Sequence, residues 1–221
     1  MERTVLILAR HGETSWNKEH RFQGQRDAPL SELGKLQAMA LHERLKDEPI
    51  DAVYTSDLSR AFETAQLILR GRDTCINPTP ELRERHMGAW EGLTFDEAMK
   101  AYPEEVKKWL KEPLATVPLG EDGTHFVQRV TKFFERLLNM HSGERILVVS
   151  HAGPIKVAIC SLLNWDMSCL RHFRISNGSI SVIEVGRRGA LCSTLNDECH
   201  LIKLNRALTQ ARQCGSPDQH K

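Results

Sequence analysis

The sequence predicts an α/β fold: a three-layer α/β/α sandwich around a mostly parallel, mixed sheet with one antiparallel strand. Two observations predict it. Short apolar runs, rich in β-branched residues, alternate with longer segments of helical periodicity, which is the pattern of parallel strands joined by helices. Later in the chain, two alternating runs flank an Asn-Gly pair, which predicts a hairpin and therefore an antiparallel strand.

The first third of the chain contains two strand–helix units. The runs at 4–8 (TVLIL) and 50–56 (IDAVYTS) predict buried strands. The segment 30–48 spaces its apolar residues as one face of a helix, with Ser31 as the expected N-cap. A second helix is predicted at 58–71, where a glycine ends it.

The middle of the chain predicts helices. Thr94 and Glu97 form a capping box at the start of a helix over 94–102. An apolar helical stripe runs through 125–140. We expect the segment 91–122 to be a helical insertion over one end of the sheet, where it would cover a site placed there.

The last third predicts one more strand–helix unit and the hairpin. The run at 145–150 (RILVVS) predicts a buried strand. A helix is expected over 153–164, with Pro154 at its first position, N1. The hairpin is predicted over 173–185, with its turn at Asn177-Gly178.

Length and composition set the remaining limits. The 221 residues suit one domain over 1–205, followed by a polar tail at 206–221 that we expect to be disordered. A formal net charge of +1 argues against nucleic acid or an anionic membrane as a partner. The N-terminal apolar run is too short for a signal or a span, and six scattered cysteines indicate reduced thiols, so we expect a cytoplasmic protein without a zinc site.

Cationic side chains follow three of the predicted strands. Arg10 and His11 end the first strand, Arg60 lies in the first turn after the second, and His151 ends the third. The carboxyl ends of parallel strands lie at one edge of a sheet, where ligands bind. Four such groups would repel each other without an anion between them, and a phosphate dianion matches the planar fork of arginine. The pattern therefore predicts a phosphate site.

Four motifs in order resemble one known family. They are RHGETSWN, TSDLSRAFETA, LRERHMGAWEG and VVSHAGPIK, and they begin at residues 10, 55, 82 and 148. Together they resemble the histidine phosphatase superfamily, in the branch that includes cofactor-dependent phosphoglycerate mutase and its phosphatase relatives. The resemblance extends from about Thr4 to Leu204.

The resemblance implies a phosphohistidine mechanism. His11 would be the nucleophile, and a backbone carbonyl in the Gly12 turn could hold the proton on its other ring nitrogen. Glu84 would act first as acid and then as base. If Glu84 is not this acid and base, Glu13 and Glu91 are the first other carboxylates to examine.

The resemblance also implies how the phosphate and substrate are held. Arg10, Arg60 and His151 would bind the phosphate, and Asn17 would add a side-chain donor. Backbone groups would approach the phosphate or the substrate at Gln23, Gly24 and Ala152. His86 could contact the substrate or merely pack, and both readings stay open. No metal or other cofactor is implied, because the arginines and His151 supply the positive charge.

Two departures and two details bear on the reaction. Ala152 stands where relatives often have glycine, and Asp122 where they often have serine. The stretches FQGQRDAPLSELG and LNDECHL resemble phosphatases, including α-ribazole-5′-phosphate phosphatase of cobalamin biosynthesis and broad-specificity phosphatases. We therefore favour hydrolysis of a small phosphorylated metabolite, α-ribazole 5′-phosphate among the candidates. A mutase and a weakly active phosphate-binding scaffold are the alternatives, and a homodimer is left open.

Overall fold

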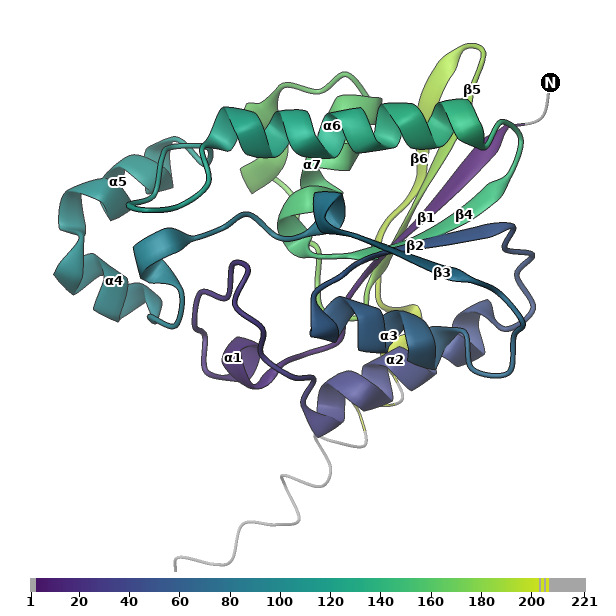
Figure 1. Cartoon of the computed structure of the whole chain (residues 1–221), viewed down its shortest axis with the longest axis horizontal. Helices are drawn as coiled ribbons and strands as arrows, with labels where there is room; N and C mark the ends of the chain where they lie inside the picture. Colours follow the sequence, from purple (N-terminus) through teal and green to yellow (C-terminus); the bar gives the residue numbers. More distant parts are fainter. Residues whose placement is uncertain (1–2, 203, 205, 207–221) are drawn as a thin grey trace, which may run out of the picture.

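A six-stranded sheet forms the centre of the molecule (Figure 1). The computed structural model describes residues 3–202, 204 and 206, so all but the first residue of the predicted tail at 206–221 lies outside the described part. The strand order across the sheet is β3-β2-β4-β1-β5-β6. Their bounds are β1 Thr4–Arg10, β2 Ala52–Ser56, β3 Ile76–Thr79, β4 Arg145–Ser150, β5 Ile180–Gly186 and β6 Gly189–Asp197.

Helices cover both faces of the sheet, which confirms the three-layer prediction. Helices α2 (Glu32–Leu45) and α3 (Ser59–Ile68) lie on one face, and α6 (Gly123–Met140) and α7 (Ala152–Leu162) on the other (Figure 1). Successive residues of a strand point to opposite faces. Within β1, two leucines accordingly enter the core under α6 and α7, and the residues between and after them enter the core under α2 and α3. No helix in the described part of the chain is long and apolar enough to cross a membrane.

One strand runs against the others, as predicted. Strands β1 to β4 pair in parallel, and β5 pairs antiparallel with both β1 and β6. The predicted position of the hairpin is wrong, however. The hairpin joins β5 to β6 after Gly186, and the turn at Asn177-Gly178 precedes β5. The Asn177 side chain instead donates to the backbone carbonyls of His11 and Gly12, so this turn supports the loop that follows β1 and not a strand ladder.

The capping signals are confirmed. The Ser31 hydroxyl accepts a hydrogen bond from the Gly34 N–H at 3.1 Å and so caps α2. Thr94 and Glu97 form the predicted capping box of α4 (Phe95–Ala101). These side chains satisfy N–H groups that have no partner within the helix, which is why they mark helix starts in the sequence.

Two helix boundaries that were predicted from a glycine and a proline differ from the prediction. Helix α3 ends at Ile68, and the glycine at 71, with φ +81°, follows in the turn. Helix α7 begins at Ala152 directly after the strand end, which places Pro154 third in the helix instead of first. Every N–H in the first turn lacks a partner within the helix, so proline is tolerated there at more than one position.

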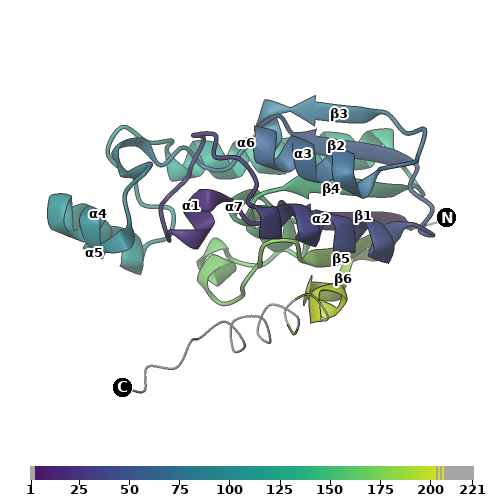
Figure 2. The same cartoon turned by 90° about the horizontal axis from the view of Figure 1, so that it is seen from below.

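The insertion predicted at 91–122 is helical and lies beyond the carboxyl ends of the strands. It contains α4 and α5 (Pro103–Lys111), and Figure 2 shows both helices at the end of the molecule opposite the N-terminus. An apolar cluster joins it to the residues just before it: Trp90 is fully buried and packs edge-on against Trp109 of α5. This cluster gives the segment 91–122, which we call the cap, a fixed shape over the end of the sheet.

Two glycines bring the loop after β1 against the start of α2. A Cβ on Gly12 would lie 2.3 Å from the Gly34 carbonyl oxygen, and a Cβ on Gly34 would lie 2.0 Å from the Glu13 carbonyl oxygen. Neither position has room for a side chain without movement of backbone. The glycines therefore set how closely this loop approaches the helix.

We expect Gly34→Ala to destabilise the fold. The added methyl meets backbone and not a flexible side chain, so the cost should be about 1–3 kcal/mol, as for overpacked cores. At roughly 2–4 °C per kcal/mol for a chain of this size, thermal unfolding should show a clear drop in Tm. Lys35→Ala, one residue later on the helix surface, is the control and should stay near the wild type. Equal Tm values for the two variants would contradict the close approach.

Candidate active site

The register between β1 and β4 brings two of the predicted strand ends together. Arg10 lies opposite Ser150, and the His11 N–H donates to the Ser150 carbonyl at 2.9 Å. His11 and His151 therefore leave the sheet side by side, with ring centroids 5.0 Å apart at 62°. Arg60 reaches them from the first turn of α3, where its Nε donates to Nδ1 of His151 at 3.2 Å. The structure thus brings together the cationic residues of all three strands.

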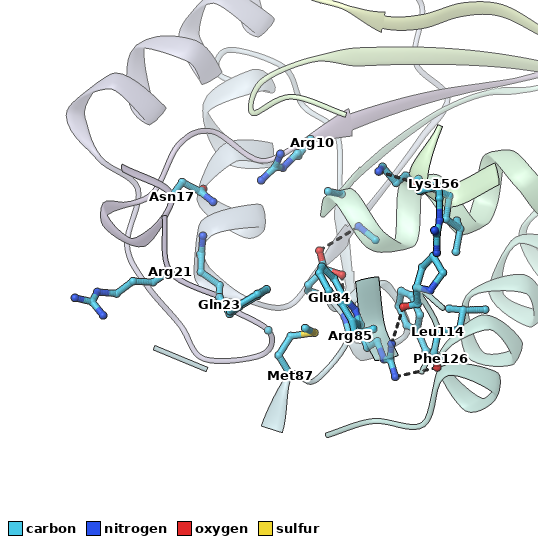
Figure 3. A pocket seen from close by; sticks show the side chains of 18 of the residues that line it. Arg10, Asn17, Arg21, Gln23, Glu84, Arg85, Met87, Leu114, Phe126 and Lys156 are labelled. Atoms are coloured by element: carbon cyan, nitrogen blue, oxygen red, sulfur yellow. Dashed lines mark hydrogen bonds between the residues drawn. The ribbon is translucent and has the colours of Figure 1, made fainter. Parts of the chain in front are cut away.

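A cavity of about 510 Å³ opens beside these residues. Figure 3 shows side chains that line it, with Arg10, Asn17 and Glu84 among those labelled. Eight of the ten residues predicted for the site line it: Arg10, His11, Asn17, Gln23, Gly24, Arg60, Glu84 and Ala152. His151 lies behind His11 and is fully buried. The His86 side chain is turned to Glu91, with Nε2 3.7 Å from Oε1, and lies outside the lining.

His11 has the tautomer and charge that a nucleophilic imidazole needs. Its Nδ1 lies 2.7 Å from the Gly12 carbonyl oxygen. A carbonyl only accepts, so Nδ1 carries the proton and Nε2 keeps its lone pair for the cavity. Burial lowers the pKa of His11 well below its usual value, and the charges of Arg60 and Arg10 lower it further. The ring is therefore neutral at pH 7.

Two arginines place positive charge at the cavity: Arg60, which is buried, and Arg10, which is partly buried. Arg10 donates from Nη1 to the Ile175 carbonyl at 2.7 Å, while its buried Nε has no hydrogen-bond partner among the described residues. Burial lowers the pKa of Arg10 to about 10, so it remains protonated at pH 7. Burial also lowers the pKa of Arg60, and the charge of the Glu84 carboxylate is the main effect that raises it again. An anion in the cavity would stabilise both guanidinium groups.

Both ring nitrogens of His151 are engaged. Nδ1 accepts from Arg60, so in the neutral ring Nε2 carries the proton, and it lies 2.8 Å from the Ser56 hydroxyl. Burial lowers the pKa of His151 well below its usual value, with Arg60 and His11 adding to the effect. His151 thus supports Arg60 and the His11 ring, and its direct contact with phosphate stays a prediction.

Asn17 is oriented by a second asparagine that we did not predict as part of the site. Its Oδ1 accepts from the Thr14 N–H and hydroxyl and from Nδ2 of Asn177 at 3.0 Å. Because the oxygen is held by these donors, the Asn17 amide NH₂ is the end left for the cavity. The Asn-Gly pair was a visible signal in the sequence, but it indicated a turn and not a contact with this loop.

The Glu84 carboxylate is seated on the start of α7. Its Oε2 accepts from the Gly153 N–H at 3.1 Å, and its Oε1 from the Arg85 N–H at 2.9 Å. A Cβ on Gly153 would lie 2.1 Å from Glu84 Oε1, so the glycine is required for this approach. Ala152, which stands where relatives often have glycine, begins the helix and does not have a positive φ, so its Cβ brings no backbone strain.

The outer wall of the cavity is mostly apolar, and sequence reasoning missed it. It is formed by Phe22, Met87, Trp109, Leu110, Pro113, Leu114, Phe126 and Leu170. These residues come from the loop between α1 and α2, the loop that carries Glu84, the cap, α6 and the segment after α7, so only the tertiary structure brings them together. Lys156 also lines the cavity, and it could have been found, because it lies one helical turn after Ala152 on the same face of α7.

Most polar groups on this outer wall are held by the protein. Arg85 donates to the carbonyls of Pro113, Leu114, Ala115 and Glu121 and so ties the Glu84 loop to the cap. Arg21 pairs with Glu19 and Glu97, and Lys156 donates to the Leu170 carbonyl at 2.7 Å. Among the described residues that line the cavity, Glu84 is the only acid.

The two alternative carboxylates lie outside the lining. Glu13 accepts from the Ser31 hydroxyl at 2.8 Å at the start of α2, and Glu91 is buried beneath the loop that carries Gly24. No group of three or more His, Cys, Asp or Glu side chains within the described ranges is arranged to hold a metal ion.

Comparison with known proteins agrees with this geometry. The family model of the histidine phosphatase superfamily (branch 1) matches residues 6–198. Phosphoserine phosphatase 1 of Hydrogenobacter thermophilus is 36% identical over 197 residues, which cover 89% of this chain and 93% of the relative. The adenosylcobalamin/alpha-ribazole phosphatase of Salmonella typhimurium is 35% identical over 192 residues, which cover 86% of this chain and 95% of the relative.

A solved structure gives the same result for the fold. Bacillus stearothermophilus YhfR superposes with a TM-score of 0.85 at 34% identity, over 90% of this chain and 99% of that one. The four motifs, the strand-end cluster around His11 and these matches lead to one conclusion: the chain belongs to the histidine phosphatase superfamily, branch 1, and is a phosphatase enzyme of that family.

Proposed function

We propose that this protein is a metal-independent phosphomonoester hydrolase that acts through a phosphohistidine on His11. One observation carries the proposal: a neutral, buried imidazole with its Nδ1 proton held by the Gly12 carbonyl faces a cavity between Arg10 and Arg60. Such a ring has a free electron pair on Nε2 next to two cations that match phosphate oxygens.

In the first step, the Nε2 electron pair of His11 forms a bond to phosphorus while the bond from phosphorus to the ester oxygen breaks. The transition state is loose and carries its charge on the equatorial oxygens, which Arg10 and Arg60 would stabilise. Glu84 in its protonated form would give its proton to the departing oxygen. The positive charge that develops on the imidazole would be stabilised by the Nδ1–H bond to the Gly12 carbonyl.

In the second step, water attacks phosphorus and the N–P bond breaks, which returns the electron pair to Nε2. Glu84, now ionised, would take the proton of the water and so return to its starting form. Further contacts to phosphate or substrate would come from Asn17, His151 and the backbone of Gln23, Gly24 and Ala152. The hydrogen bonds that Glu84 accepts from the Gly153 and Arg85 N–H groups support a position of its carboxylate beside the phosphate.

The cavity wall favours a substrate with an apolar group. Phe22, Trp109, Leu114 and Phe126 surround the space outside the cationic cluster. The ammonium group of phosphoserine would need a carboxylate, and Glu84 is already assigned to the reaction. A benzimidazole nucleotide such as α-ribazole 5′-phosphate fits this chemistry, and it is our first candidate. The same wall argues against a mutase, which must hold a sugar acid and its phosphates at both ends.

His11→Ala should abolish turnover of p-nitrophenyl phosphate in EDTA. No other imidazole with a free nitrogen lines the cavity in the described part of the chain, so the rate should fall by more than about 10³-fold. His125→Ala, which changes an exposed histidine on α6, is the matched control and should retain activity. More than a trace of activity in folded His11→Ala would rule out this nucleophile. Phosphoglycerate interconversion that requires a bisphosphate primer would indicate a mutase instead.

Glu84→Gln should separate the two steps. Glutamine cannot transfer a proton, so an alkyl phosphate with a basic leaving group should react about 10²–10⁴-fold more slowly. p-Nitrophenyl phosphate has a stable leaving anion, so its first step should suffer far less and phosphohistidine should accumulate. Rapid quenching should then show a burst of nitrophenol matched by acid-labile phosphate on the protein. Glu81→Gln, which changes a surface pair with Arg136, is the control. Equal losses on both esters without a burst would exclude Glu84 as the acid and base.

Leu110→Lys should reduce the preference for apolar esters. Leu110 lines the cavity and is 49% exposed, so the change should not disturb the core. Loss of roughly 1–3 kcal/mol of apolar contact corresponds to about 10–200-fold in relative kcat/KM for 2-phenylethyl phosphate against glycerol 3-phosphate. Leu119→Lys, at an 88% exposed position outside the lining, is the control. An unchanged ratio in Leu110→Lys would mean that this wall does not contact the substrate.

A further inference from the structure

Glu91 is a buried acid that lies outside the cavity lining and has no part in the steps above. It directly follows the short 3₁₀ turn Gly88–Trp90, and its side chain is only 4% exposed. Its Oε1 accepts from the Met87 N–H at 3.0 Å and from the Gln25 N–H at 2.8 Å. One carboxylate oxygen therefore joins two loops that are more than sixty residues apart in the sequence.

The loop around Gly24 is shaped to admit this carboxylate. A Cβ on Gly24 would lie 2.0 Å from Glu91 Oε1 and 2.8 Å from the Met87 nitrogen. Gly24 also has φ +54°, a conformation that side chains other than glycine rarely adopt. The close contact with Glu91 requires glycine at position 24, because a Cβ would clash with the carboxylate and because other residues rarely adopt this backbone conformation.

Each of the two joined loops holds a residue of the proposed reaction. The carbonyls of Gly24 and Arg26 accept from Nη2 and Nη1 of Arg60 at 2.7 and 2.8 Å. On the other side, Gln25 Nε2 donates to the Glu84 carbonyl at 3.2 Å. The loop that orients Arg60 and the loop that carries Glu84 thus meet at Glu91.

We propose that Glu91 is a positioning residue that sets the placement of Glu84 relative to Arg60; this rests on the roles proposed above for those two residues. Glu91 does not line the cavity, and its Oε1 is occupied by two N–H groups. Its other oxygen faces Arg26, whose Nε is 3.9 Å away. Glu91 therefore acts through the loops and not as a second acid.

The test compares Glu91→Ala, Glu91→Asp and Glu91→Gln on two esters, p-nitrophenyl phosphate and 2-phenylethyl phosphate. Glutamine keeps an acceptor oxygen at the same reach, so Glu91→Gln should stay within about threefold of the wild type on both. Alanine removes the acceptor and aspartate withdraws it by one methylene. In both variants kcat/KM for 2-phenylethyl phosphate should fall by about 10²-fold, as for a misplaced catalytic group. The loss factor for p-nitrophenyl phosphate should be smaller than this by at least about fivefold, because its leaving group does not need the acid.

A double substitution identifies the residue through which Glu91 acts. In the Glu84→Gln background there is no acid to misplace. Adding Glu91→Ala should therefore lower kcat/KM for both esters by the same factor. Rates are divided by the amount of folded protein, which thermal unfolding shows for each variant. If Glu91→Ala does not fold, Glu91→Asp takes its place.

Three results would overturn the proposal. The first is an equal loss on both esters in Glu91→Ala and Glu91→Asp while Glu84 is present. The second is wild-type activity in those variants. The third is Glu91→Gln as slow as Glu91→Ala, which would mean that the carboxylate itself transfers protons. Failure of the proposed function is recognised separately, because Glu84→Gln alone would then show no dependence on the leaving group.

Discussion

The parallel register between β1 and β4 is the constraint on which the site depends. By placing Arg10 opposite Ser150, it delivers His11 and His151 to adjacent points at one edge of the sheet. The residues on either side of β1 are packed in two separate cores, so a shift of one residue would exchange the faces of the whole strand. The hydrophobic core thus sets the position of the reactive imidazole.

Burial then determines the chemistry of the cluster. Two histidines and Arg60 are almost fully removed from water, Arg10 is partly buried, and burial lowers the pKa of all four groups. For the histidines this leaves neutral rings at pH 7, while the arginines keep their charge because their usual pKa is so high. The same desolvation therefore produces a nucleophile with a free electron pair beside cations that favour an anion.

The cap is joined to the sheet through the loop of Glu84 and not only by apolar contact. Arg85 binds four backbone carbonyls of the cap, and Arg129 binds Glu121 and the carbonyls of Glu81 and Arg83. Because cap and acid–base loop share these bonds, the apolar wall and the reacting groups keep one geometry. Substrate selection and proton transfer are in this way linked by the same segment of chain.

The sequence by itself determined the layers, the parallel strands, most helix caps and the cluster around His11, because these depend on periodicity and on what directly follows each strand. It misplaced the hairpin, since Asn177-Gly178 serves a contact with the loop after β1 that local patterns do not contain. Only the tertiary structure decided the apolar wall, the engagement of both His151 nitrogens and the burial of Glu91. Those features arise from contacts between segments far apart in the chain, and their geometry is set by packing and not by the residues' neighbours in sequence.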